Sequence, residues 1–105
     1  MQLGEPELEA ELRRQYDEGI RLGYRAARSY QLFTPACKRY IGGVRAVQHL
    51  LRRGNTAGFS FAMKNDRPDL TIESLVLDSK FAHLFSDEDR EMARQKLRDG
   101  GDPRI

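Results

Sequence analysis

The sequence has little of what a disulfide-rich, β-rich or membrane-spanning protein needs. It contains one cysteine in 105 residues, so no intramolecular disulfide can form, which is typical of the reducing cytoplasm. Valine, isoleucine and threonine together number only 10, which disfavours β-structure. No apolar run approaches the roughly 20 residues of a membrane span. The acidic start of the chain also lacks the basic and then apolar pattern of a secretory signal. We therefore expect a cytoplasmic protein that makes no contact with a membrane.

The residues that are abundant favour helix. Leucine, alanine and arginine recur throughout the chain, and all three are good helix formers. Charged residues make up 32% of the chain, above the usual roughly 25%, which indicates a modest core under a heavily solvated surface. A length of 105 residues is near the commonest size of one domain. We expect an all-α, single compact domain over residues 1–105, built from five or six short helices and frayed at 1–5 and 100–105.

Apolar spacing predicts a first helix near the N-terminus. Pro6 suits its first turn, and Leu8, Leu12 and Tyr16 form one apolar stripe at spacing four. Two acid–base pairs at i, i+4 are expected to support this helix: Glu9–Arg13 and Asp17–Arg21. We expect a break near Gly19–Gly23. The alternative is a continuous helix whose glycines let another element approach closely.

Further helices are predicted between punctuating glycines and prolines. Gly42–Gly43 marks a stop, and Gly54 is a natural residue just beyond a helix end. Thr71 is a predicted N-cap, and Ser86 with Asp89 resembles a capping box. The expected helical segments are 24–34, 44–53, 59–64, one that begins after Thr71, a short turn at 81–85, and a last helix that ends near Asp99.

The segment 69–97, DLTIESLVLDSKFAHLFSDEDREMARQKL, resembles the end of a small bacterial all-helical domain of uncharacterised function. The matching positions are Asp69, Leu70, Thr71, Glu73, Phe81, Leu84, Phe85, Ala93, Arg94 and Leu97. The resemblance implies an all-helical single domain and no particular activity. Caps and core packing also explain nearly every one of these positions without any function.

Charge is distributed unevenly along the chain, although the net charge is only +2. Residues 13–53 hold ten basic and two acidic residues, whereas residues 1–12 hold four acids and no base. Such a basic stretch attracts polyanions, because bound phosphates release their counterions. We therefore predict nucleic acid as the first candidate partner, and a merely solvated basic face remains the alternative. The candidate phosphate contacts are Arg13, Arg14, Arg21, Arg25, Arg28, Arg39, Arg45, Arg52 and Arg53, with Tyr24 or Tyr40 available for stacking.

A helix-turn-helix across Gly42–Gly43 is one version of this prediction. The second helix, 44–53, would then present Arg45, Gln48 and Arg52, whose side chains are chemically able to read guanine or adenine. This helix is short and carries four apolar residues, which leaves it a narrow outward face. The sequence therefore favours contact with the phosphate backbone over base reading.

A rival prediction is a protein–protein interaction or accessory domain without nucleic-acid contact. The stripe of Leu8, Leu12 and Tyr16 would then pack on another chain or a second copy. Enzyme chemistry is the least favoured interpretation, because Cys37 with His49 or His83 lacks an identifiable orienting residue. These three residues also lack the short spacings of a metal site. We predict a non-enzymatic protein with no cofactor, no metal and no small-molecule substrate.

Overall fold

The computed structural model describes residues 3–24, 42–53 and 57–105, and every regular element in them is helical. The elements are α1 (Glu5–Arg21), α4 (Gly43–Leu51), α5 (Ala57–Lys64), the 3-10 helix η1 (Pro68–Leu70), α6 (Ile72–Leu77), the 3-10 helix η2 (Ala82–Leu84) and α7 (Asp87–Asp99). These described residues contain no strand, so the prediction of a single all-α domain is confirmed. The predicted helix at 24–34 lies almost entirely outside the described residues, as do Cys37, Tyr40 and Gly54.

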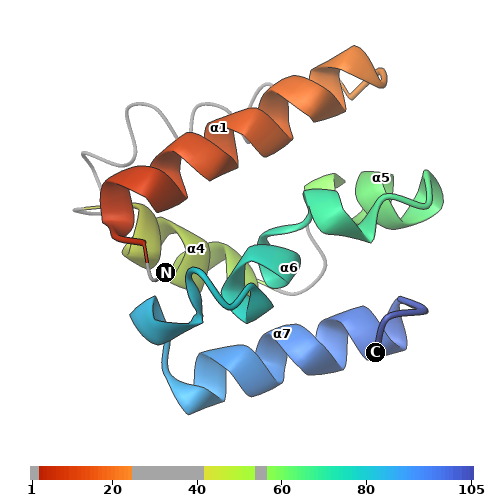
Figure 1. Ribbon diagram of the computed structural model, residues 1–105. Helices are drawn as coiled ribbons and strands as arrows, with labels where there is room; N and C mark the ends of the chain where they lie inside the picture. The colour runs from red at the N-terminus through yellow and green to blue at the C-terminus, as the bar shows by residue number, and fades with distance from the viewer. Residues whose placement is uncertain (1–2, 25–41, 54–56) are drawn as a thin grey trace.

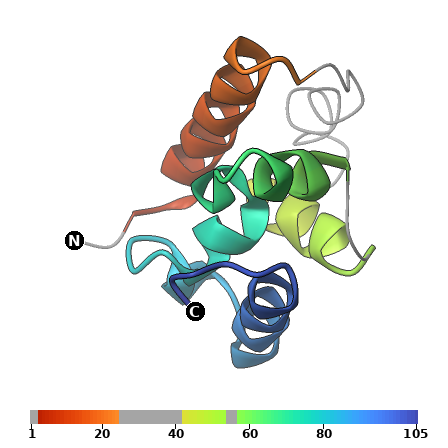
Figure 2. The same ribbon diagram turned by 90° about the vertical axis from the view of Figure 1, so that its right-hand side faces the viewer.

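Helix α6 occupies the centre of the fold. Figures 1 and 2 show α1 on one side of it and α7 on the other, with α4 and α5 alongside. The main hydrophobic core contains residues of α1, α4, α6 and α7 and of the segment around η2, but none of α5. Its buried members are Leu8, Leu12, Val47, Leu51, Leu75, Val76, Phe81, Phe85 and Ala93. Leu8 and Leu12 of the apolar stripe are therefore buried in the core of this chain, because both side chains are at most 1% exposed.

Side-chain caps begin two of the helices where the sequence predicts them. The Thr71 hydroxyl accepts the Ser74 backbone N–H at 3.0 Å at the start of α6. At the start of α7 the Ser86 hydroxyl accepts the Asp89 N–H at 3.1 Å, and the Asp89 carboxylate accepts the Ser86 N–H at 3.2 Å. The predicted N-cap and capping box are both confirmed.

Among the described helices, α1, α5 and α7 end in the same double hydrogen-bond pattern, known as the Schellman motif. After α1, Tyr24 N–H donates to the Gly19 carbonyl at 2.8 Å and Gly23 N–H to the Ile20 carbonyl at 3.0 Å. The equivalent bonds close α5 and α7. The left-handed residue of each motif is Gly23, Asp66 or Gly101, with φ of 106°, 55° and 85°. The predicted break near Gly19–Gly23 is therefore confirmed, with Gly19 inside α1.

The last residues fold back on the molecule where the sequence predicts fraying. Asp102 is only 4% exposed, and its backbone N–H donates to the Leu97 carbonyl at 2.9 Å. Its carboxylate accepts the Arg104 guanidinium at 2.7 Å, and Arg104 also reaches the Ser74 hydroxyl on α6 at 3.3 Å. At the other end Leu3 N–H donates to the Lys80 carbonyl at 3.0 Å.

Among the described helices, none combines the length and the apolar character needed to cross a bilayer.

Candidate functional site

The nine arginines predicted to contact nucleic acid divide into three groups. Arg25, Arg28 and Arg39 lie outside the residues that the structure describes. The paired group forms ion pairs with acids of the same chain: Arg14, Arg21 and Arg52. The exposed group forms no ion pair with another described residue: Arg13, Arg45 and Arg53. The fold therefore neutralises part of the predicted basic surface.

On α1 the ion pairs differ from the predicted ones. Arg14 donates to Glu11 at 2.5 Å and Arg21 to Glu18 at 2.5 Å, both at spacing i, i+3. The hydrogen bond from Arg21, with a further one from Arg67, lowers the pKa of Glu18 to about 2. The predicted pairs Glu9–Arg13 and Asp17–Arg21 are wrong, because Arg21 bonds Glu18 and the Glu9 carboxylate is used elsewhere.

Asp89 collects hydrogen bonds from α4 and from its own helix start. It is fully buried, and its carboxylate accepts Gln48 Nε2 and Arg52 Nη2, each at 2.8 Å. Burial alone would raise the pKa of Asp89, but the bonds from Gln48, Ser86 and Arg52 outweigh it and hold that pKa below its usual value. Two of the three side chains predicted to read bases, Gln48 and Arg52, therefore bind Asp89 instead.

The N-terminus of α4 is capped from α1. Glu9 Oε1 accepts the Gly43 N–H at 3.0 Å, and Glu5 Oε1 accepts the Val44 N–H at 3.1 Å. The negative charges of these carboxylates also interact favourably with the positive end of the α4 dipole. A Cβ on Gly42 would lie 1.8 Å from Glu5 Oε1, and Gly42 has φ of 114°. Gly42 and Gly43, predicted as a helix stop, thus make room for two glutamates of α1 that accept the first backbone N–H groups of α4.

The solvent-exposed face of α4, together with Arg52 and Arg53 just after the helix, is basic. Arg45, His49, Arg52 and Arg53 follow the spacing i, i+4, i+7, i+8 that places residues on one helix face. Residues 43–53 contain no acid. All four residues are exposed, including the Arg52 side chain at 46%. We call these four residues the α4 basic face.

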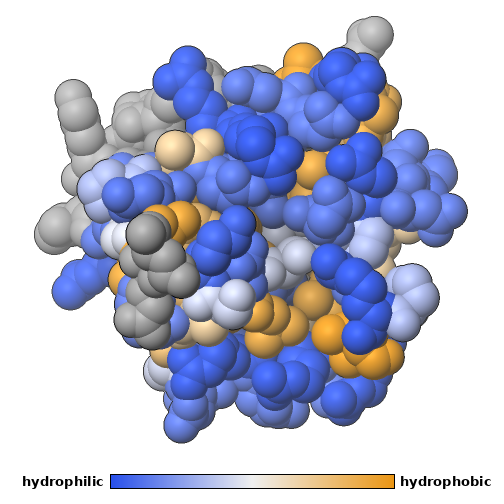
Figure 3. All heavy atoms as spheres, viewed as in Figure 1, coloured by the Kyte–Doolittle hydropathy of each residue, from blue (hydrophilic) through white to orange (hydrophobic). Residues whose placement is uncertain are grey.

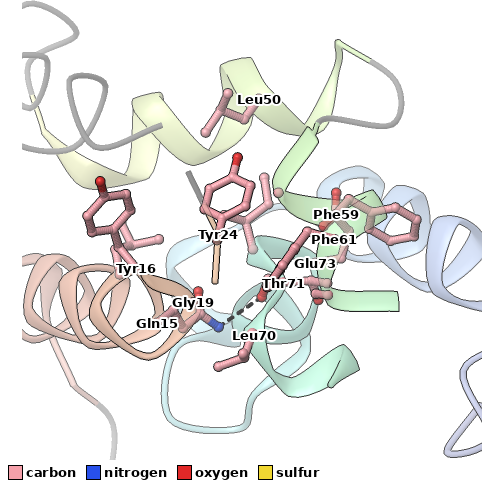
Figure 4. A pocket seen from close by; sticks show the side chains of 14 residues that line it. Gln15, Tyr16, Gly19, Tyr24, Leu50, Phe59, Phe61, Leu70, Thr71 and Glu73 are labelled. Atoms are coloured by element: carbon pink, nitrogen blue, oxygen red, sulfur yellow. Dashed lines mark hydrogen bonds between the residues drawn. The ribbon is translucent and has the colours of Figure 1, made fainter. Parts of the chain in front are cut away.

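A small cavity lies between α1, α5 and α6 (Figure 4). Its volume is about 70 Å³. Apolar and aromatic side chains make up most of its wall, among them Leu12, Tyr16, Phe59 and Phe61. Gln15 also lines the cavity, and its Nε2 donates to the backbone carbonyls of Asp69 at 2.9 Å and Thr71 at 3.0 Å.

Glu73, at the second position of α6, lines this cavity and is fully buried. Its Oε2 accepts Lys96 Nζ at 3.3 Å, whereas Oε1 has no donor among the described residues. Burial raises the pKa of the Glu73 carboxyl, against the weaker opposing effects of its own backbone N–H and of Lys96. From the sequence, an acid at this position is expected only to interact with the positive end of the helix dipole. Its place between the core residues Ile72 and Val76 is the one signal that hints at burial.

The other side chains considered for catalysis or metal binding are His49, His83 and Cys37. His49 and His83 are both exposed, and Cys37 lies outside the described residues. No group of three or more metal-ligating side chains occurs among the residues that were placed.

Comparisons with protein-family models, with curated proteins and with solved structures found no match for this chain. The resemblance of residues 69–97 to a bacterial helical domain therefore remains a prediction, and the function rests on the geometry alone.

Proposed function

We propose that this chain is a non-enzymatic binding module that contacts an anionic partner, nucleic acid first, through the α4 basic face. One observation carries the proposal: residues 43–53 hold three arginines and a histidine on one face and no acid. Arg45 and Arg53 on this face make no ion pair with another described residue. Because the fold does not use these two charges, they can neutralise phosphates.

The proposed contact is with the phosphate backbone and not with bases. Gln48 and Arg52, which could read bases, already donate to Asp89. The N-terminal end of α4, which a recognition helix would direct at bases, carries the Glu5 and Glu9 carboxylates. Two acids at that end repel a nucleic acid, so the strongest contact is expected at Arg53, beyond the C-terminal end of α4, and a weaker one at Arg45, which is exposed but lies in the first turn.

The test compares two double variants in a binding titration with labelled single-stranded and duplex oligonucleotides over a salt series. Arg45→Ala with Arg53→Ala removes both unpaired charges, and Lys64→Ala with Arg98→Ala is the matched control of exposed bases elsewhere. We expect the slope of log affinity against log salt to fall by about 0.7–0.9 for each contact removed, in the first variant only.

Equal weakening in both variants would contradict a specific role for the α4 basic face. The proposal as a whole fails if the wild-type chain binds neither oligonucleotide at low salt.

A second candidate function is protein–protein interaction without nucleic acid. It is favoured by the ion pairs of Arg14, Arg21 and Arg52, which neutralise half of the described candidate arginines. The surface predicted for it is wrong, because Leu8 and Leu12 are buried in the core of this chain. On the face shown in Figure 3, hydrophilic residues dominate and the hydrophobic ones form separate patches. A protein partner that binds this face would therefore meet a largely polar surface.

A further inference from the structure

The cavity between α1, α5 and α6 has on its wall a polar atom that no described residue uses, the amide oxygen of Gln15. Gln15 is only 6% exposed and lines the cavity. Its Nε2 donates to the backbone carbonyls of Asp69 and Thr71 at 2.9 and 3.0 Å. Only the N–H₂ end of an amide can donate, so these two bonds fix which end is nitrogen and leave Oε1 as the remaining acceptor.

Gln15 Oε1 is accessible, whereas Glu73 Oε1 is not. Among the described residues, Glu73 Oε1 is the one side-chain polar atom that is both fully enclosed and without a partner. Gln15 Oε1 accepts no hydrogen bond from a described residue either, so it keeps surface that a water-sized group can touch. Figure 4 shows the amide nitrogen on the Thr71 side and the amide oxygen on the side of Gly19 and the tyrosine rings. Gln15 Oε1 therefore faces the cavity.

The hydroxyl groups of the two tyrosines in the wall point elsewhere. Figure 4 shows the Tyr16 and Tyr24 hydroxyls on the α4 side of their rings, away from the Gln15 amide. Neither tyrosine is without a partner, and the Tyr24 ring packs against Phe61 with the ring centres 5.0 Å apart. The Thr71 hydroxyl already donates one hydrogen bond and accepts another. The tyrosines therefore offer the cavity their rings, and Gln15 Oε1 is the acceptor that can orient a ligand.

The wall of the cavity favours a neutral aromatic body. Aromatic rings pack well against one another in offset or edge-to-face arrangements, and four aromatic side chains line the cavity: Tyr16, Tyr24, Phe59 and Phe61. Gln15 is neutral, and the Glu73 carboxylate is 1% exposed and lies 3.3 Å from Lys96 Nζ. The described part of the wall therefore does not replace the hydration that a cation would lose on entry.

The volume of about 70 Å³ limits how much of a ligand enters. At about 10–15 Å³ for each water-sized group, the cavity holds about five non-hydrogen atoms. A five-membered aromatic ring with one N–H, such as pyrrole, has this size and carries its donor on an otherwise apolar body.

We propose that this cavity binds small neutral aromatic molecules that carry one hydrogen-bond donor, with the donor on Gln15 Oε1 and the ring against Tyr24, Phe59 and Phe61. Burial of the ring supplies most of the affinity, and the hydrogen bond to Gln15 selects molecules that have a donor. The site does not use the α4 basic face, so this proposal does not rest on nucleic-acid binding.

The first test compares pyrrole with two other five-membered rings on the full chain. Furan has the same shape but no donor, and pyrrolidinium is a cation. Binding is followed by NMR through the Gln15 side-chain N–H₂ signals and the methyl groups of Ala62, Thr71 and Ile72, which line the cavity. We expect pyrrole to bind in the millimolar range and furan about tenfold more weakly, the equivalent of one hydrogen bond. Pyrrolidinium should also bind more weakly than pyrrole.

A second test narrows the cavity without disturbing the helix. Gly19 lines the cavity, and a Cβ there would meet Tyr24 Cβ at 3.6 Å, which is ordinary contact. Alanine is also a better helix former than glycine within α1. We expect Gly19→Ala to keep or raise Tm and to weaken pyrrole binding at least about tenfold, because the methyl group occupies space that the ring needs. Asp17→Ala, at an exposed position of α1, is the matched control and should bind pyrrole like the wild type.

The comparison of the three rings uses the wild-type chain, so it holds however the variants fold. The proposal is overturned if pyrrole does not bind, which would leave a cavity for water only. It is also overturned if furan or pyrrolidinium binds as tightly as pyrrole, or if a folded Gly19→Ala binds pyrrole like the wild type.

Discussion

Replacing Asp89 with asparagine tests the polar junction between α4 and α7. The carboxylate accepts Gln48 and Arg52 at 2.8 Å each and the Ser86 N–H at 3.2 Å. An asparagine at this position would keep one carbonyl oxygen and place an amide N–H₂ where at least one donor now points. Losing one charge-assisted bond in a buried site costs about 1.5–3 kcal/mol. The Arg52 ion pair adds less than about 1 kcal/mol, since the Arg52 side chain is 46% exposed.

We therefore expect Asp89→Asn to lower the free energy of unfolding by about 2–3 kcal/mol and Tm by roughly 10 °C or more. Urea and thermal unfolding followed by circular dichroism measure both. Asp17→Asn, at an exposed position on α1, is the matched control and should change stability by less than about 0.5 kcal/mol.

The effect of Asp89→Asn should also depend on pH. Because the folded-state pKa of Asp89 is lowered, its contribution is complete well above the ordinary aspartate value of about 3.9 and is lost as the pH falls through the folded pKa. The two proteins should converge in stability in that acidic range. A difference below about 0.5 kcal/mol at neutral pH, or one that persists unchanged in acid, would refute the role given to the carboxylate.

Three further substitutions test single features of the fold by urea unfolding. Asp66→Gly should stabilise the chain by about 0.5–1 kcal/mol, because Asp66 closes α5 with φ of 55° and glycine adopts that conformation without strain; no gain would contradict the motif. Gly42→Ala should cost about 2 kcal/mol or more, chiefly because φ of 114° is strained for a residue with a Cβ, and adding Glu5→Ala should not restore the lost stability. Burial raises the pKa of Glu73, so the wild type should gain stability relative to Glu73→Gln as the pH falls from neutral toward the unfolded pKa of about 4.3. A stability difference between the two proteins that does not change with pH would contradict this.

Local signals in the sequence were enough to predict much of the fold. Thr71 and Ser86 cap helices through residues three positions away, so their role is visible in a short window. The periodic positions Leu8, Leu12, Leu75 and Val76 all enter the core. The end of α1 followed from the glycines that its closing turn requires.

The candidate site depended on long-range contacts that no local pattern reveals. Glu9 was expected to pair with Arg13 one turn away, but the fold places the backbone of Gly43 within 3.0 Å of its carboxylate. Arg52 was predicted to contact phosphate, but the packing of α4 against α7 places its guanidinium within hydrogen-bond distance of Asp89. The burial of Glu73 likewise results from the packing of α6 against Lys96 of α7.

The most direct test of the proposed function is a two-dimensional amide NMR titration of the full chain with short duplex and single-stranded oligonucleotides, at low and then physiological salt. We predict salt-sensitive shifts at Arg45, His49 and Arg53 on the α4 basic face, and no comparable shifts along α7. No shifts at low salt, or shifts confined to α7, would contradict the account and leave protein interaction as the function to test.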